Sequence, residues 1–209
     1  MNKNEKFVIT INRELGSGGG SVGRKLAERL DVKFINKALL QALKEQFHLS
    51  LEELEKLKGA KDGWWVELQR RVIPFADKSN DAPADLITTE DVFNTETKVL
   101  KNLAEKESCV FVGRSAFYVL RNHPNHLSVF IQAPMEQRIQ RVMEKNKLSR
   151  DLATKLIQKI DERRENYVNK FAKTSRYDTR NYDLVINMDH LKTDDAVEMI
   201  LDYIFRQSL

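Results

Sequence analysis

A short run of glycines is the part of this sequence that is best suited to chemistry. Residues 7–11 are apolar or β-branched, and residues 16–20 read Gly-Ser-Gly-Gly-Gly. Val22, Leu26 and Leu30 follow with the spacing of one helix face. Glycines let successive main-chain N–H groups converge on one anion, and the start of a helix adds partial positive charge. We therefore predict a phosphate-binding loop rather than a flexible linker, and its residues are Gly16, Ser17, Gly18, Gly19, Gly20 and Ser21.

The loop lacks the lysine of the standard pattern G-x-x-x-x-G-K-[ST], in which the lysine reaches the β- and γ-phosphates of a nucleotide. With Gly18 as the second glycine of the pattern, Gly19 stands at the lysine position. Ser21 is left as a hydroxyl that could lie near a metal ion. A cation must then come from elsewhere, and Arg13 is our first candidate because its guanidinium can fold back over the loop. A salt bridge to Glu14 is the alternative for Arg13.

Other arginines follow two further apolar segments. Arg114 comes directly after residues 109–112 and is suited to a bidentate contact with a phosphate or carboxylate. Arg138 and Arg141 are three apart and share a helix face. The next helical pattern carries Arg163 and Arg164. Together the last four favour a lid that closes over a triphosphate, although a solvated face with salt bridges explains any single one equally well.

Five apolar segments are predicted to be the strands that position these residues. They are near-continuous runs, which are typical of parallel strands covered on both faces. The segments are residues 7–11, 32–35, 109–112, 127–132 and 184–187. Helical patterns lie between them, so we expect a doubly wound α/β fold with ligands at the carboxyl ends of the strands. The long stretch between the second and third strands is expected to be a mostly helical insertion.

Composition sets further bounds on the class of protein. The chain has 209 residues and is expected to form one domain, or one domain with an insertion. A formal net charge of +4 suits an anionic ligand but is too small to indicate nucleic acid. The single cysteine, Cys109, lies in an apolar run and is predicted to be a buried thiol. No apolar run is long enough to span a membrane, so we expect a cytoplasmic protein.

The chain resembles the bacterial cytidylate-kinase-like proteins, a divergent branch of the nucleoside monophosphate kinases within the P-loop NTPases. The resemblance depends on the order and spacing of several short segments and covers nearly the whole chain. These segments are residues 9–19, 34–37, 109–115, 120–121, 130–134 with Arg138 and Arg141, 161–167 and 181–184. Two positions depart from the pattern. Ser115 stands where true cytidylate kinases have aspartate, and Gly20 stands where relatives usually have a basic residue.

The resemblance implies a P-loop NTPase fold in a single domain over residues 1–209, with a five-stranded parallel sheet and helices on both faces. It also implies a helical monophosphate-binding insertion over residues 41–92 and an arginine-bearing lid over residues 138–176. The expected activity is ATP-dependent phosphoryl transfer to a nucleoside monophosphate, with CMP or dCMP as the first guess. The alternatives are a nucleotide-binding regulator with little or no turnover and a kinase of another small metabolite.

The expected roles follow from this expected activity. Catalytic charge is assigned to Arg13, Arg163 and Arg164. ATP is expected at residues 16–21 with Arg138 and Arg141, the acceptor at Arg114 and Ser115, and Mg²⁺ near Ser21. The expected partners are nucleotide substrates, without nucleic acid or membrane, and a homo-oligomer is compatible with this prediction.

Overall fold

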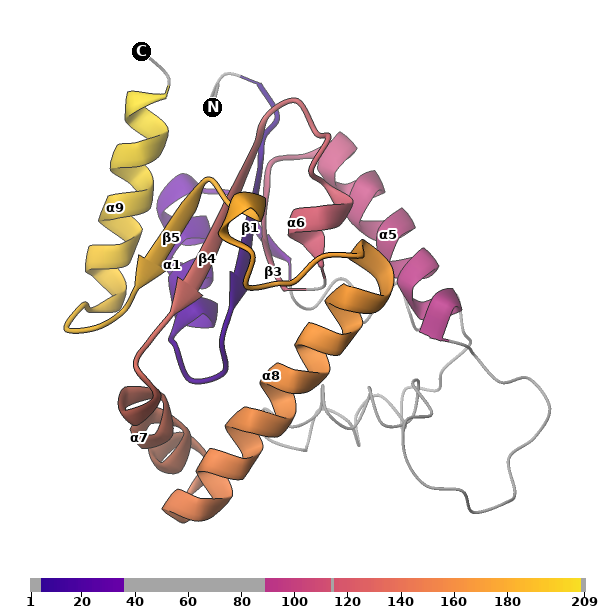
Figure 1. Ribbon diagram of the computed structural model, residues 1–209. Helices are drawn as coiled ribbons and strands as arrows, with labels where there is room; N and C mark the ends of the chain where they lie inside the picture. Colours follow the sequence, from indigo (N-terminus) through magenta and orange to yellow (C-terminus); the bar gives the residue numbers. More distant parts are fainter. Residues whose placement is uncertain (1–4, 36–88, 114, 208–209) are drawn as a thin grey trace, which may run out of the picture. The chain divides into compact units, whose positions relative to one another are not determined.

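A computed structural model describes residues 5–35, 89–113 and 115–207 (Figure 1). The chain divides into two compact units, one formed by residues 1–36 and 100–209 and the other by residues 37–99. The expected helical insertion over residues 41–92 lies almost entirely outside the described residues. The following description concerns the first unit.

Five parallel strands form one sheet in the order β2-β3-β1-β4-β5. The strands are β1 (Val8–Arg13), β2 (Lys33–Ile35), β3 (Cys109–Val112), β4 (His126–Gln132) and β5 (Leu184–Asn187). All five predicted strands are confirmed, and β1 extends two residues beyond its predicted end. Its position in the centre of the sheet places Arg13 beside Ile131 of β4 in the register.

Helices connect the strands. They are α1 (Gly19–Leu30), α5 (Thr89–Lys106), α6 (Ala116–Val119), α7 (Met135–Asn146), α8 (Arg150–Ala172) and α9 (Thr193–Arg206), and a short 3-10 helix, η1, covers Thr179–Asn181. Local signals explain their ends. The side chain of Ser149 accepts a hydrogen bond from the Leu152 N–H at the start of α8, and Lys147 ends α7 in the left-handed conformation. None of the described helices is long and apolar enough to cross a membrane.

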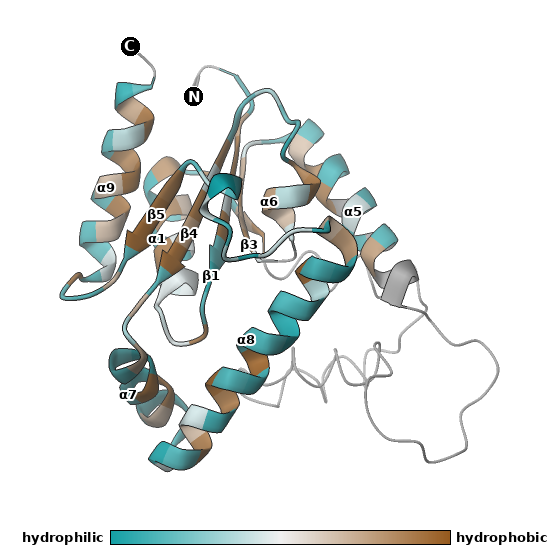
Figure 2. Ribbon diagram, viewed as in Figure 1, coloured by the Kyte–Doolittle hydropathy of each residue, from teal (hydrophilic) through white to brown (hydrophobic). Residues whose placement is uncertain are grey.

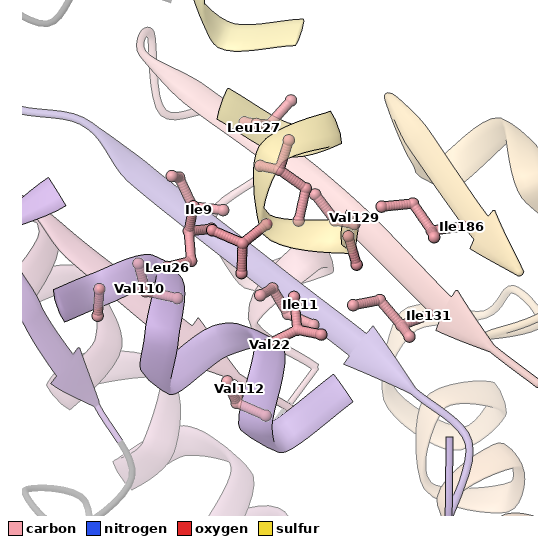
Figure 3. Close-up of a cluster of buried hydrophobic side chains, with 14 of the residues drawn as sticks. Ile9, Ile11, Val22, Leu26, Val110, Val112, Leu127, Val129, Ile131 and Ile186 are labelled. Atoms are coloured by element: carbon pink, nitrogen blue, oxygen red, sulfur yellow. The ribbon is translucent and has the colours of Figure 1, made fainter. Parts of the chain in front are cut away.

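The main core lies between the sheet and the helices α1 and α9. Ile9 and Ile11 of β1 pack there with Val22 and Leu26 of α1, as the side chains in Figure 3 show. Strand residues alternate between the two faces, so Asn12 and its neighbours on β4 point to the opposite face. The strands are apolar while the helices have one apolar and one polar side (Figure 2). This arrangement is the doubly covered parallel sheet that the sequence predicts.

The helices α7 and α8 form a hairpin at the carboxyl edge of the sheet (Figure 1). The hairpin has its own apolar cluster, in which Ile139 and Val142 of α7 contact Ala153 and Ile157 of α8. Leu15, which follows β1, packs against the same cluster. The hairpin occupies most of the region predicted as a lid, and it lies where the glycine-rich loop leaves the sheet.

Candidate functional site

The glycine-rich loop joins the end of β1 to the start of α1, as the sequence predicts. Gly16 and Gly18 have φ values of +81° and +89°, a conformation that side chains with a Cβ rarely adopt. A Cβ on Gly16 would also lie 2.7 Å from the carbonyl oxygen of Arg138. Glycine at residue 16 is therefore required both by the backbone conformation and by the close approach of α7.

Only some of the hydrogen-bond donors of the loop are used within it. The Gly19 N–H donates to Ser17 Oγ over 3.4 Å, and the Ser21 N–H donates to the Gly18 carbonyl over 2.9 Å. The N–H and hydroxyl of Ser17 both donate to the carbonyl of Glu14, over 3.4 and 3.0 Å. The N–H groups of Gly16, Gly18 and Gly20 donate to no residue that the structure describes. Such main-chain donors beside a helix start are what a phosphate group requires.

Arg13 fills the space of the missing lysine. A Cβ on Gly19 would lie only 2.6 Å from the Cβ of Arg13, so the two positions cannot both carry a side chain in this geometry. The Arg13 guanidinium extends from Gly19 toward Gly113, where a Cβ would overlap it. The sequence predicts that this guanidinium folds back over the loop. It reaches instead toward the end of β3, because Gly113 has no side chain and leaves room there.

Arg141 contacts the loop directly. Its Nη1 donates to the carbonyl oxygens of Ser17 and Gly16, over 3.0 and 3.3 Å, and lies 3.7 Å from the place of a Cβ on Gly18. A cation is thereby held against the loop, on the side of α7.

Arg138 is placed differently from the lid cation that the sequence predicts. Its side chain is 6% exposed, and all three of its nitrogens are engaged. Nη1 lies 3.0 Å from Oε1 of Glu14, Nε donates to the carbonyl of Leu15 over 2.8 Å, and Nη2 binds Asp161. The physical reason is that the shared face of α7 packs beneath the loop. Arg138 therefore supports the residues that lead into the loop through buried contacts, and its role toward ATP stays a prediction.

Asp161 of α8 is the centre of an arginine cluster. Its Oδ1 accepts from Arg164 Nη1 at 3.3 Å and from Arg176 Nη1 at 3.4 Å, and its Oδ2 binds Arg138. Arg164 and Arg176 also donate to the carbonyl of Arg13. Burial and the neighbouring Arg176 lower the pKa of Arg164 to about 10, which still leaves it charged at neutral pH.

Arg163 is not part of this cluster. It is partly exposed, and its side chain makes no hydrogen bond or ion pair with any residue within the described ranges. The next residue along a helix is turned by about 100°, so Arg163 and Arg164 cannot both face the loop.

The cluster carries an excess of positive charge. Among the described residues, its guanidinium groups belong to Arg13, Arg138, Arg141, Arg164 and Arg176, and its carboxylates belong to Glu14, Asp161 and Glu165, which accepts from the Arg176 N–H. The unused loop N–H groups and this surplus of cations fit a polyphosphate. The same residues offer few free oxygen ligands for a divalent metal ion. Ser21 offers an exposed hydroxyl on the first turn of α1, and the carboxylates of Glu14 and Asp161 are already paired with arginines.

The predicted acceptor residues lie at the end of β3. Arg114 falls outside the described residues. Ser115 is buried with φ at +52°, and its hydroxyl oxygen has no partner among the residues that the structure describes. A buried hydroxyl without a partner is uncommon and suits contact with a ligand or a water molecule.

Sequence reasoning missed several residues that shape the site. Arg176 is fully buried, and its Nε has no hydrogen-bond partner among the described residues. The hydroxyl of Tyr182 accepts from Asn12 Nδ2 and donates to the carbonyl of Arg176, both over 2.7 Å. Burial raises the pKa of Tyr182, so its hydroxyl stays protonated. Only the family resemblance pointed to the segment around Asp161, and nothing local distinguished Arg176.

Known proteins resemble this chain over most of its length. A model of the cytidylate kinase-like family matches residues 8–190. A cytidylate kinase of Sulfolobus acidocaldarius is 22% identical over 203 residues, which cover 96% of each chain. A cytidylate kinase of Pyrococcus horikoshii is 26% identical over 186 residues, which cover 88% of this chain and 80% of that one.

Solved structures agree with the fold. A crystal structure of an uncharacterized protein from Eubacterium ventriosum aligns with a TM-score of 0.67 at 27% identity, covering 95% of this chain and 98% of that one. A shikimate kinase from Acinetobacter baumannii aligns with a TM-score of 0.54 at 18% identity, covering 98% of this chain and 96% of that one. The P-loop NTPase fold expected from the sequence is confirmed.

Proposed function

Because the chain belongs to the cytidylate kinase-like family, we propose that it transfers a phosphoryl group from ATP to a nucleoside monophosphate. CMP and dCMP are the first candidates for the acceptor, since the curated relatives named above are cytidylate kinases. The observation that carries the proposal is the glycine-rich loop, whose unused N–H groups lie within a cluster of guanidinium groups.

Phosphoryl transfer needs positioning and positive charge more than covalent help from the protein. The unused N–H groups of Gly16, Gly18 and Gly20 hold the phosphates of ATP, and Arg141 stabilises the loop through its bonds to the carbonyls of Ser17 and Gly16. The hydroxyl of Ser21 and the ATP phosphates would hold Mg²⁺, which neutralises phosphate charge when bound. Arg164 adds charge at the carbonyl of Arg13.

Arg13 takes the place of the loop lysine. Its stem lies where the lysine stem would begin, and its guanidinium reaches the end of β3 at Gly113. It therefore extends from the ATP loop to Gly113, which precedes in sequence the acceptor residues that we assign, Arg114 and Ser115. A cation in that place balances the charge that moves from donor to acceptor. Arg163, which lies on a different side of α8 from Arg164, stays a predicted catalytic residue.

The test is a coupled assay of the purified protein with ATP, Mg²⁺ and each nucleoside monophosphate. We expect turnover with CMP or dCMP, and we expect Arg13→Ala to lower kcat at least about tenfold, or about 1.4 kcal/mol of barrier. Arg29→Ala is the matched control, because Arg29 is an exposed arginine of α1 that pairs with Glu198.

ATP binding without turnover on any acceptor would favour a nucleotide-binding regulator. The observation that supports this alternative is Gly19 at the position of the usual lysine. Turnover on a different small hydroxylated or phosphorylated metabolite would keep the kinase and change the acceptor. Absence of ATP binding would overturn the proposal.

A further inference from the structure

Both main-chain polar groups of Leu15 are held by side chains of the α7–α8 hairpin. The Leu15 N–H donates to Oδ1 of Asp161 over 3.0 Å, and the Leu15 carbonyl accepts from Nε of Arg138 over 2.8 Å. Arg138 and Asp161 also bind each other. The three residues thus form a closed ring of hydrogen bonds at the residue that precedes the glycine-rich loop.

Packing reinforces this ring. The side chain of Leu15 lies in the apolar cluster that holds α7 against α8. Gly16 lies so close to the backbone of Arg138 that no Cβ fits between them. Glu14 is tied down as well, through its ion pair with Arg138 and a bond of 3.2 Å from the Ala133 N–H to its Oε2. Each residue from 14 to 16 therefore contacts α7, α8 or the connection that leads into α7.

One atom of Asp161, its Oδ1, accepts hydrogen bonds both from the backbone that leads into the loop and from two arginines other than Arg138. Besides the Leu15 N–H it accepts from Arg164 and Arg176, which also donate to the carbonyl of Arg13. One buried carboxylate consequently sets the place of two cations and of the loop backbone. Loss of the carboxylate would release the N–H of Leu15 and leave these guanidinium groups without their counterion.

We propose that Asp161 is a positioning residue that, together with Arg138, fixes the phosphate loop to the α7–α8 hairpin. The loop and the root of the hairpin then form one unit, and loop geometry depends on the hairpin. This inference rests on the proposed phosphoryl transfer for its effect on rate, but the attachment itself can be tested without turnover. The competing role is an ion pair that contributes only to global stability.

Hydrogen–deuterium exchange on the intact protein separates these roles. In Asp161→Ala we expect the amide exchange of residues 13–17 to rise at least about tenfold, because the Leu15 N–H loses its acceptor, while exchange in α9 stays unchanged. In Asp161→Asn we expect a smaller rise, since an amide oxygen can still accept. Glu162→Ala is the control, because Glu162 is the adjacent, exposed residue of α8.

A rise that spreads equally over β1, α8 and α9 would mean lost global stability and would overturn the proposal, as would unchanged exchange at residues 13–17. Where Asp161→Ala fails to fold, the Asp161→Asn result decides in the same way. These outcomes do not depend on the activity of the parent protein.

Kinetics then test the effect on the reaction. If the parent turns over, Asp161→Asn should lower kcat about tenfold or more with little change in the KM of the acceptor, because misplaced groups cost transition-state binding. Equal kcat in Asp161→Asn and the parent would overturn the positioning role. A parent without turnover would count against the proposed function, and the exchange result would still decide the attachment.

Discussion

The side-chain stem of Arg13 lies against the α-carbon of Gly19, at the position where a standard phosphate loop carries its lysine. A Cβ on Gly19 would come 2.6 Å from the Cβ and 3.0 Å from the Cγ of Arg13. The absence of a side chain at residue 19 therefore makes the room that the Arg13 side chain occupies. A lysine introduced at residue 19 would meet Arg13, so the standard loop cannot be restored by that single change.

The same relationship predicts opposite results for two neighbouring glycines. Gly19→Ala should destabilise the protein by about 1–3 kcal/mol, because the new methyl group has to displace the Arg13 stem. Gly20→Ala should be neutral or stabilise it by about 0.4–1 kcal/mol, because Gly20 is exposed in α1 and a Cβ there would meet nothing within 4 Å outside the adjoining helix backbone. Urea unfolding of both variants measures the difference. Equal unfolding free energies would mean that Arg13 does not fill the lysine position.

Arg141 is expected to affect ATP more than folding. Its guanidinium bonds the carbonyls of Gly16 and Ser17, and hydrogen bonds to charged groups contribute about 1.5–3 kcal/mol. Arg141→Ala should therefore lower kcat/KM for ATP about tenfold or more, as steady-state kinetics would show. Arg150→Ala is the control, since Arg150 forms an exposed pair with Glu136 and should leave the kinetics unchanged. Similar kinetics for both variants would remove Arg141 from the ATP site.

Tyr182 links β1 to the segment that carries Arg176. In Tyr182→Phe the side chain of Asn12 and the carbonyl of Arg176 each lose a buried partner, which should cost about 1–3 kcal/mol of unfolding free energy. Chemical denaturation measures this loss. Tyr118→Phe provides the comparison, because the Tyr118 hydroxyl bonds no residue in the described part of the chain, and it should change little. A smaller loss in Tyr182→Phe than in Tyr118→Phe would contradict the link.

His126 is expected to make stability depend on pH. Burial lowers its pKa from 6.5 to about 4, and its Nε2 lies 2.7 Å from the hydroxyl of Thr10. Above pH 6.5 the ring is neutral in both states and contributes nothing. As the pH falls from 6.5 to about 4, only the unfolded chain binds the proton, so stability decreases by up to about 3 kcal/mol.

Urea unfolding at pH 7 and pH 4.5 checks this prediction. The loss of stability between the two conditions should be smaller in His126→Gln than in the parent. His190→Gln, at a side chain that is 91% exposed, should behave like the parent. The same pH dependence in all three proteins would show that His126 is not responsible.

Much of the fold could be predicted because the relevant signals are local. The strands at residues 109–112 and 184–187 are short apolar runs, and the order of strand, glycines and helix identifies the loop without knowledge of any distant residue. Cys109 was likewise predicted to be a buried thiol. The structure confirms its burial, which raises its pKa to about 12.

The place of each arginine could not be predicted in the same way. The spacing of Arg138 and Arg141 indicates a shared face, but not that one of them is buried beneath the loop while the other lies against it. Residues that bind each other here are far apart in sequence, as Arg13 and Arg176 are. Helical periodicity says nothing about which distant segment a face will meet.

The sequence by itself determined the strand order along the chain, the glycine-rich loop and the absence of its lysine, since each depends only on residues that are neighbours. Only the tertiary structure decided that Arg13 fills the lysine position and that Asp161 holds the backbone of Leu15. Those contacts arise because parallel strands bring their carboxyl ends to one edge, where α7 and α8 pack against the loop. The direction of a long charged side chain at such an edge is set by the space and the counterions that packing provides.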